Sequence, residues 1–123
     1  MHHAAKAYSA TAQKTANPRE VEADLLLDAA ARLQAIRDGW DERKNELSAA
    51  LLNNRRLWSI FISTVTNPDN PLPTQVRQNI ANLGLFVLNH TIKLEARPEP
   101  SRLDVLISIN REVAAGLRAS ATP

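Results

Sequence analysis

The chain is organised around one stretch, AALLNNRRLWSIFISTVTNPDNPLP, which runs from Ala49 to Pro73. Apolar side chains recur in it at steps of three and four residues, the spacing of one face of an α-helix. The helical pattern ends at Asn67-Pro68, because a proline disfavours the helical conformation of the residue before it. The stretch therefore predicts a helix, a stiff elbow over residues 67–73 and a second helix beginning near Pro73, whose missing amide hydrogen costs nothing in a first turn.

The sequence predicts further helices on both sides of this elbow. A long helix should begin at Asn17-Pro18, with Asn17 as the cap, and end near Gly39. It should be preceded by a short alanine-rich helix over about residues 4–14. Its apolar face is expected to include Val21, Leu25, Ala29, Leu33 and Ile36, and to be widened by Leu26 and Ala30.

After the elbow, the apolar residues between Val76 and Leu94 predict a helix whose apolar coverage is wide enough for the centre of a bundle. Gly84 in its interior predicts the close approach of a neighbouring helix. A last helix is expected to start at Ser101 as its cap and to end near Gly116, which suits a left-handed cap. The ends, residues 1–3 and 119–123, are expected to be frayed.

Composition agrees with this pattern. The 123 residues suit one domain, and they contain no cysteine, three glycines and few aromatic residues, which favours helices over sheets. The sequence therefore predicts an all-α fold, a single-domain bundle of one short and four longer helices. It contains no stretch suited to span a bilayer and no signal peptide, so we expect a cytoplasmic protein.

Two polar features of the central stretch are candidates for function. Asn54 interrupts the apolar stripe, so it either fixes helix register in the core or contacts a partner. Trp58 on the same stripe is either a core residue or an interface anchor. Arg55 and Arg19 are candidates for pairing with acidic groups of a partner, and Arg77 is a further candidate for partner binding. Arg19, which is unfavourable in a first helical turn, hints at a specific carboxylate partner.

The motifs of enzymes are missing from the sequence. There is no phosphate-binding glycine loop, no cluster with metal-ligand spacing and no nucleophile elbow, so we expect neither catalysis nor a cofactor. The net charge is only +2, and the arginines lack the interleaved aromatic residues of single-stranded RNA readers. Direct RNA binding is therefore the less favoured alternative, and a structural adaptor that dimerises through the wide apolar helix stays open.

Short pieces along the whole chain resemble the FlaF family of flagellar biosynthesis regulators of alphaproteobacteria. They occur in order from the first helix to the last, and together they cover nearly the whole chain. The matching pieces are Ala7-Tyr8, Pro18-Arg19-Glu20, Asn54-Arg55-Arg56-Leu57-Trp58, the elbow from Asn70 to Pro73 with Arg77, Asn82-Leu83-Gly84, Val87 with His90-Thr91, and Asn110-Arg111 leading to Gly116-Leu117.

The resemblance implies a cytoplasmic, non-catalytic factor needed for flagellin production or export. Its implied partners are the flagellin monomer and the companion regulator FlbT, which represses flagellin synthesis at the messenger level. Two modes of action are compatible with the resemblance. In one, the protein holds a flagellin helix in a groove as a chaperone does, and in the other it acts with FlbT on flagellin messenger RNA.

Overall fold

The computed structural model describes residues 17–121. Four long helices make up most of this part: α2 (Pro18–Asp38), α4 (Leu47–Thr66), α5 (Thr74–Ala96) and α6 (Leu103–Ala121). A short helix, α3 (Trp40–Arg43), and a 3-10 turn, η1 (Lys44–Glu46), join α2 to α4, and a second 3-10 turn, η2 (Pro100–Arg102), precedes α6. The predicted all-α fold and its four longer helices are confirmed, and the helix expected over residues 4–14 lies outside the described residues.

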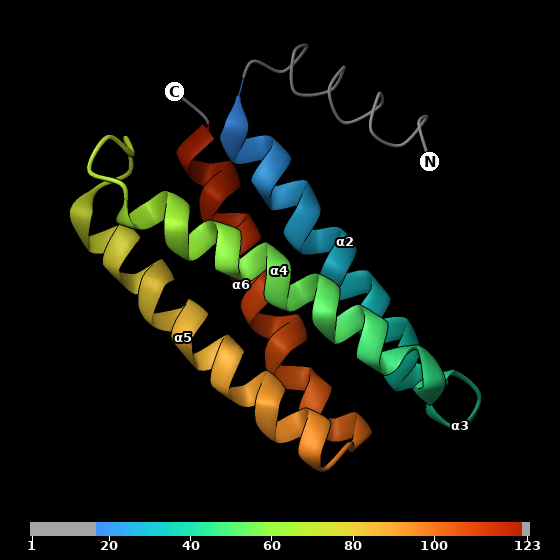
Figure 1. Cartoon of the computed structure of the whole chain (residues 1–123). Coiled ribbons are helices and arrows are strands. Elements are labelled where there is room, and N and C mark those ends of the chain that lie inside the picture. Colours follow the sequence, from blue (N-terminus) through green and yellow to red (C-terminus); the bar gives the residue numbers. More distant parts are fainter. Residues whose placement is uncertain (1–16, 122–123) are drawn as a thin grey trace, which may run out of the picture.

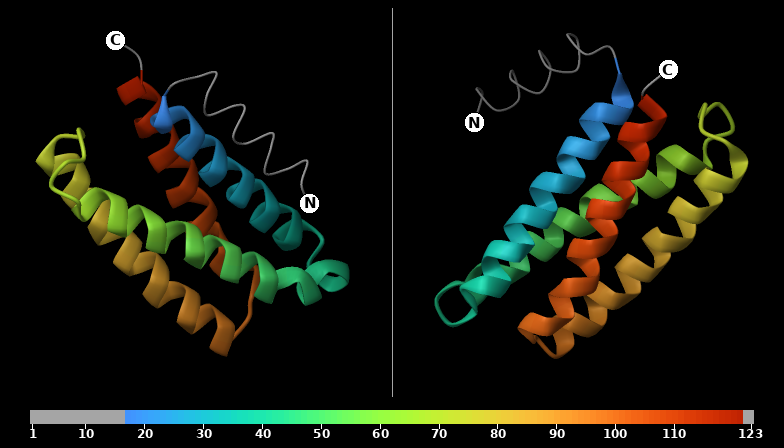
Figure 2. Two further views of the ribbon diagram at one scale, coloured as in Figure 1. Left: turned by 45° about the horizontal axis from the view of Figure 1, so that its top comes forward. Right: turned by 180° about the vertical axis from the view of Figure 1, so that it is seen from behind.

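The bundle consists of two antiparallel helix pairs (Figures 1 and 2). α2 and α6 form the most extensive interface, and α4 packs on α5 after the chain reverses at residues 67–73. α4 also packs on α2 and so joins the pairs, whereas α5 contacts α6 only sparsely. The expectation that α5 is the central helix is wrong, because α5 lies on the outside and its apolar coverage continues onto an exposed face.

Local signals explain where α2 begins and why α4 and α5 lie so close. The side chain of Asn17 accepts a hydrogen bond from the backbone N–H of Arg19 (3.0 Å) and caps α2, as predicted. A Cβ atom on Gly84 would lie 2.6 Å from Cγ1 of Ile62 and 3.3 Å from Cε3 of Trp58. The predicted close approach at Gly84 is therefore confirmed, and α4 is the helix that approaches.

Three local predictions were wrong. Gly116 does not end α6, which continues as a helix to Ala121, beyond the start of the tail that was expected to be frayed. Ser101 lies inside the 3-10 turn η2 rather than capping α6. In α2, Leu26 and Ala30 are buried as predicted, but Ala23 is buried as well and Val21 and Leu25 are only half-buried, because the side that packs on α4 and α6 includes Ala23.

Candidate functional site

Trp58 and Asn54 lie in the core and not at a surface. Both are fully buried, as is Asn110 of α6. The indole Nε1 of Trp58 donates a hydrogen bond to Oδ1 of Asn110 (2.8 Å), and Nδ2 of Asn110 donates to Oδ1 of Asn54 (2.8 Å) and to the carbonyl oxygen of Leu26 (3.4 Å). This network connects α4, α6 and α2, so the two asparagines that interrupt apolar stripes hold three helices in register.

The chemistry of the network also fixes the orientation of its amides. An indole N–H can only donate, so Asn110 must present its oxygen to Trp58 and its NH₂ group to Asn54. Nδ2 of Asn54 is then left without a hydrogen-bond partner among the described residues. The network is thus a core element whose members have no surface for a partner, although sequence pattern alone left both roles open for Asn54 and Trp58.

Arg77 holds the elbow between α4 and α5. Its guanidinium donates hydrogen bonds to the carbonyl oxygens of Leu72 (3.2 Å) and Asn67 (3.3 Å) and to the hydroxyl of Thr74 (3.3 Å). A further, longer bond reaches the carbonyl oxygen of Val65 (3.5 Å). The structure thus uses Arg77 to satisfy backbone groups where one helix ends and the next begins.

Arg19 has its carboxylate partner within the chain. Its Nε lies 2.6 Å from Oε1 of Glu22, one turn further along α2, and both side chains are mostly buried. Burial raises the pKa of Glu22 above its ordinary value, and the charge and hydrogen bond of Arg19 oppose this only in part. The carboxylate partner expected for Arg19 is therefore found, and it belongs to this helix.

The outer face of α5 carries a second apolar stripe, which we call the outer stripe: Ala81, Leu85, Leu88 and Ile92. These residues are spaced by four, three and four positions, so they lie along one side of the helix over three turns. Leu85 is 57% exposed and Ile92 is 61% exposed. The buried residues of α5, including Gly84 and Val87, lie on a different side that packs on α4.

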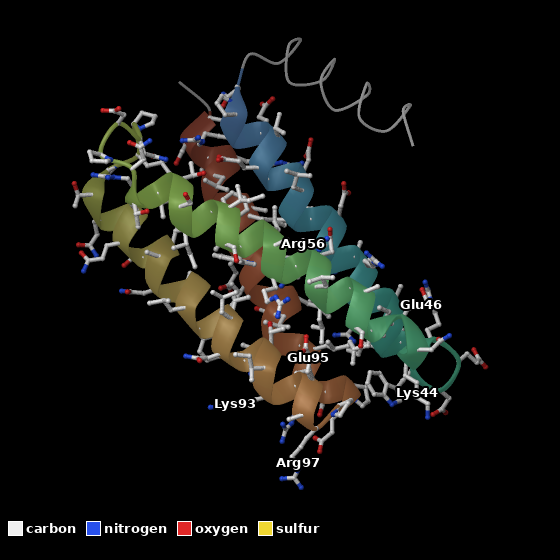
Figure 3. All side chains as sticks on the ribbon, in the orientation of Figure 1. Lys44, Glu46, Arg56, Lys93, Glu95 and Arg97 are labelled. Atoms are coloured by element: carbon white, nitrogen blue, oxygen red, sulfur yellow. The ribbon has the colours of Figure 1, made fainter. Side chains whose placement is uncertain are left out.

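Basic side chains flank the outer stripe. We call Arg55 of α4 and Lys93 of α5 the basic rim, and Figure 3 shows Lys93 on the side of α5 turned away from α4. Across residues 17–121 the side chains of these two residues form no hydrogen bond and no ion pair. The groove between α4 and α5 is therefore bordered by positive charge that the fold does not neutralise.

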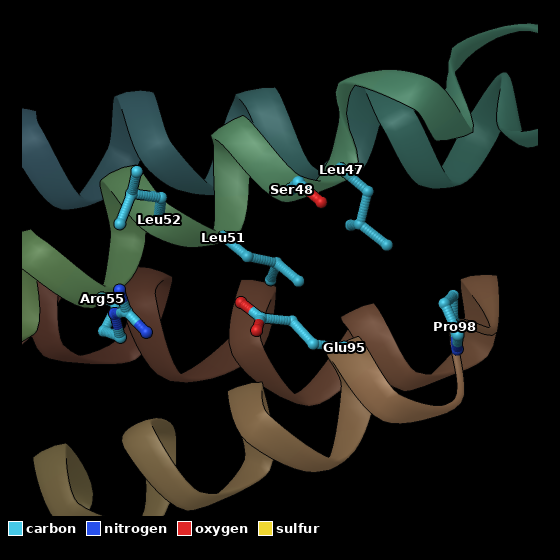
Figure 4. Close-up of a pocket in the computed structure, with 7 residues that line it drawn as sticks. All are labelled: Leu47, Ser48, Leu51, Leu52, Arg55, Glu95 and Pro98. Carbon is cyan, nitrogen blue, oxygen red and sulfur yellow. The ribbon is translucent and has the colours of Figure 1, made fainter.

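A hollow of about 430 Å³ lies at one end of this groove. Its lining comes from the start of α4, the end of α5 and the following turn: Leu47, Ser48, Leu51, Leu52, Arg55, Glu95 and Pro98 (Figure 4). Arg55 and Glu95 bring opposite charges to it from the two helices but form no ion pair. The floor is apolar and the mouth is charged, which is a surface suited to an amphipathic segment.

The α2–α6 pair differs from this groove in its charges. Arg37 pairs with Asp104 across the two helices (2.7 Å), Arg118 pairs with Asp24, and Arg111 donates to Gln34. The fold itself therefore supplies partners for these cations. All four of the exposed large hydrophobic side chains in the described part of the chain, in contrast, lie on α4 and α5: Ile60, Leu85, Phe86 and Ile92.

Sequence reasoning proposed Arg55 of this groove as a contact for a protein partner and missed the outer stripe. Leu85 and Ile92 were assigned to the general apolar coverage of a central helix, whereas they form a separate exposed stripe. The four-three-four spacing of the outer stripe beside the buried stripe was the available signal. Two stripes on one helix indicate two packing surfaces. Within residues 17–121 the outer stripe is covered only in part, since Ala81 packs against the core while Leu85 and Ile92 stay exposed.

The comparisons with known proteins agree with the resemblance drawn from the sequence. The family described as Flagellar protein FlaF matches residues 4–117. No curated protein and no solved structure is significantly similar to the chain. None of the helices within residues 17–121 is long and apolar enough to cross a membrane.

Proposed function

The chain belongs to the FlaF family of flagellar proteins, and from this premise we propose that it is a non-enzymatic factor that promotes flagellin production or export by binding the flagellin monomer. Filament subunits carry long terminal helices with apolar stripes that must not pair before assembly. A small cytoplasmic protein with an open apolar groove can cover such a helix until export.

The observation that carries this proposal is the groove between α4 and α5. It combines exposed apolar residues with cations that have no partner within residues 17–121. Large exposed apolar side chains bordered by charge are typical of protein interaction surfaces. The polar network of Trp58 gives this groove a rigid base, because it fixes α4 against α6.

Calorimetric titration of the protein with purified flagellin monomer, at low and at high salt, tests the proposal. We expect binding with a negative heat-capacity change, which reports burial of apolar surface, and an affinity that falls only modestly with added salt. Absence of binding at both salt concentrations would remove the direct role on flagellin.

The basic rim favours one alternative, in which the protein acts on flagellin messenger RNA together with FlbT. Contacts with phosphates release counterions, so RNA affinity falls steeply with salt. The same titration with flagellin messenger RNA, with and without FlbT, distinguishes the two functions. Tight, salt-sensitive RNA binding without flagellin binding would favour the alternative.

A further inference from the structure

We propose that the outer stripe and basic rim form a docking groove for one amphipathic helix that carries acidic side chains beside its apolar stripe. This inference rests on the proposed function, in which the helix belongs to flagellin. It goes further in naming the surface that binds, the residues that form it and the charge of the occupant.

The geometry suits a helix as the occupant. The outer stripe runs from Ala81 to Ile92, about 16 Å along α5 at 1.5 Å per residue. It follows the groove that α4 and α5 form, and a helix laid in this groove would place its own apolar residues between Leu85 and Ile92, which are more than half exposed. An interface of one helix over three turns is small, so we expect an affinity in the micromolar range.

Charge selects an acidic occupant. Arg55 and Lys93 have no partners among the described residues, and Glu95 is an acidic side chain near the end of the groove. The groove therefore remains positive, and acidic residues on both flanks of an incoming helix would pair with the basic rim. A helix with basic flanks would bring like charges together, which is unfavourable.

The same argument disfavours the occupants that this chain could supply. A second copy would bring its own basic rim against this one. Residues 1–16 contain Lys6 and Lys14 but no aspartate or glutamate, so they offer no acid for the rim. The groove thus suits a different, acidic protein segment better than the chain itself.

The test uses the full chain and two variants with the same chemistry at different sites. Leu85→Ser with Ile92→Ser removes the outer stripe. Ile60→Ser is the matched control, because Ile60 is 64% exposed but lies about 200° around α4 from Ile62, which faces α5 at Gly84. We expect unchanged melting temperatures, a loss of flagellin affinity of at least about tenfold for the double variant, and no loss for the control.

Charge is tested in the same way. Arg55→Glu should weaken flagellin binding by about three- to tenfold, whereas Lys44→Glu, which makes the same change outside the groove, should not. If Arg55→Glu abolishes binding and the double serine variant does not alter it, the surface recognises charge alone and the proposal is overturned. A wild-type dimer that the double serine variant dissociates would also overturn it, since the second copy would then be the occupant.

A second probe separates this inference from the proposed function. Two designed helical peptides share one apolar stripe, with glutamate at the flanking positions of one and lysine at those of the other. We expect the glutamate peptide to bind in a manner that the double serine variant weakens, and the lysine peptide not to bind. If flagellin does not bind but the glutamate peptide does, the proposed function fails and the groove stands; if the glutamate peptide does not bind, the groove is wrong.

Discussion

The α2–α6 pair and the α4–α5 pair are antiparallel helix pairs of similar length, yet they differ in how many apolar side chains they expose and in whether their cations are paired. α2 and α6 bury their large apolar residues and connect arginines such as Arg37 and Arg118 to carboxylates across the interface. α4 and α5 expose Leu85 and Ile92 and leave the basic rim without partners in the described part of the chain. The α2–α6 pair thus supplies partners for its own arginines. The α4–α5 pair has apolar and basic side chains that residues 17–121 leave without partners.

The largest expected effect comes from the residue that joins the two pairs. Trp58→Ala should lower the free energy of unfolding by about 3–5 kcal/mol, because it empties a fully buried site and leaves Oδ1 of Asn110 without its hydrogen-bond donor. Urea unfolding measures this. Trp40→Ala is the control, since Trp40 is only partly buried in the α2–α4 connection, and its loss should be clearly smaller. Equal losses would show that Trp58 has no special role between the pairs.

The glycines of the two pairs should respond in opposite directions. Gly84→Ala should destabilise the protein by about 1–2 kcal/mol, because the new Cβ would overlap Ile62 and this exceeds the gain in helix propensity. Gly116→Ala in α6 meets no atom within 4 Å and should stabilise by about 0.5–1 kcal/mol. Thermal melts of both variants are sufficient, and a change of the same sign in both would contradict the close packing of α4 on α5.

The arginines of the two pairs differ in what they stabilise. Arg77→Met should cost about 1–2 kcal/mol, because backbone carbonyls of the elbow lose their hydrogen bonds. Arg37→Met should cost clearly less, since its carboxylate partners are more than half exposed. Chemical unfolding of the two variants under one condition measures the difference. If Arg37→Met costs as much as Arg77→Met, then surface charge pairing contributes more to the α2–α6 pair than we infer.

The smallest expected effect is a pH dependence within the α2–α6 pair. Burial raises the pKa of Glu22 in the folded state, so in the window above its ordinary value the folded protein binds more protons than the unfolded chain. Its contribution to stability therefore falls as pH rises through that window. Urea unfolding between pH 4 and pH 7 should show a smaller decline for Glu22→Gln than for the wild type, and identical profiles would contradict the shift.

Sequence alone predicted the features that depend on local chemistry. The cap at Asn17, the elbow at residues 67–73 and the close approach at Gly84 follow from the backbone properties of asparagine, proline and glycine, and the structure has all three. The hydrogen-bonded role of Asn54 was one of two alternatives, because a polar residue on an apolar stripe does not reveal whether its partner lies inside the chain.

Features that depend on which helices are neighbours could not be predicted. The apolar arc of α5 shows how much surface could be buried, but not that α4 covers only one side of it. Gly116 looked like a helix end, although α6 continues past it, supported by its packing on α2. The outer stripe was missed for the same reason, since its exposure follows from the absence of a covering helix in the described chain and not from its own residues.

The central claim is that the α4–α5 groove binds the partner and that the α2–α6 pair supports it. A methyl NMR titration of the labelled protein with flagellin monomer tests this most directly. We predict that the methyl signals of Leu85, Leu88 and Ile92 shift on binding, while those of Ile60 on α4 and Leu27 on α2 do not. Shifts confined to α2 and α6, with the outer stripe unchanged, would contradict the account.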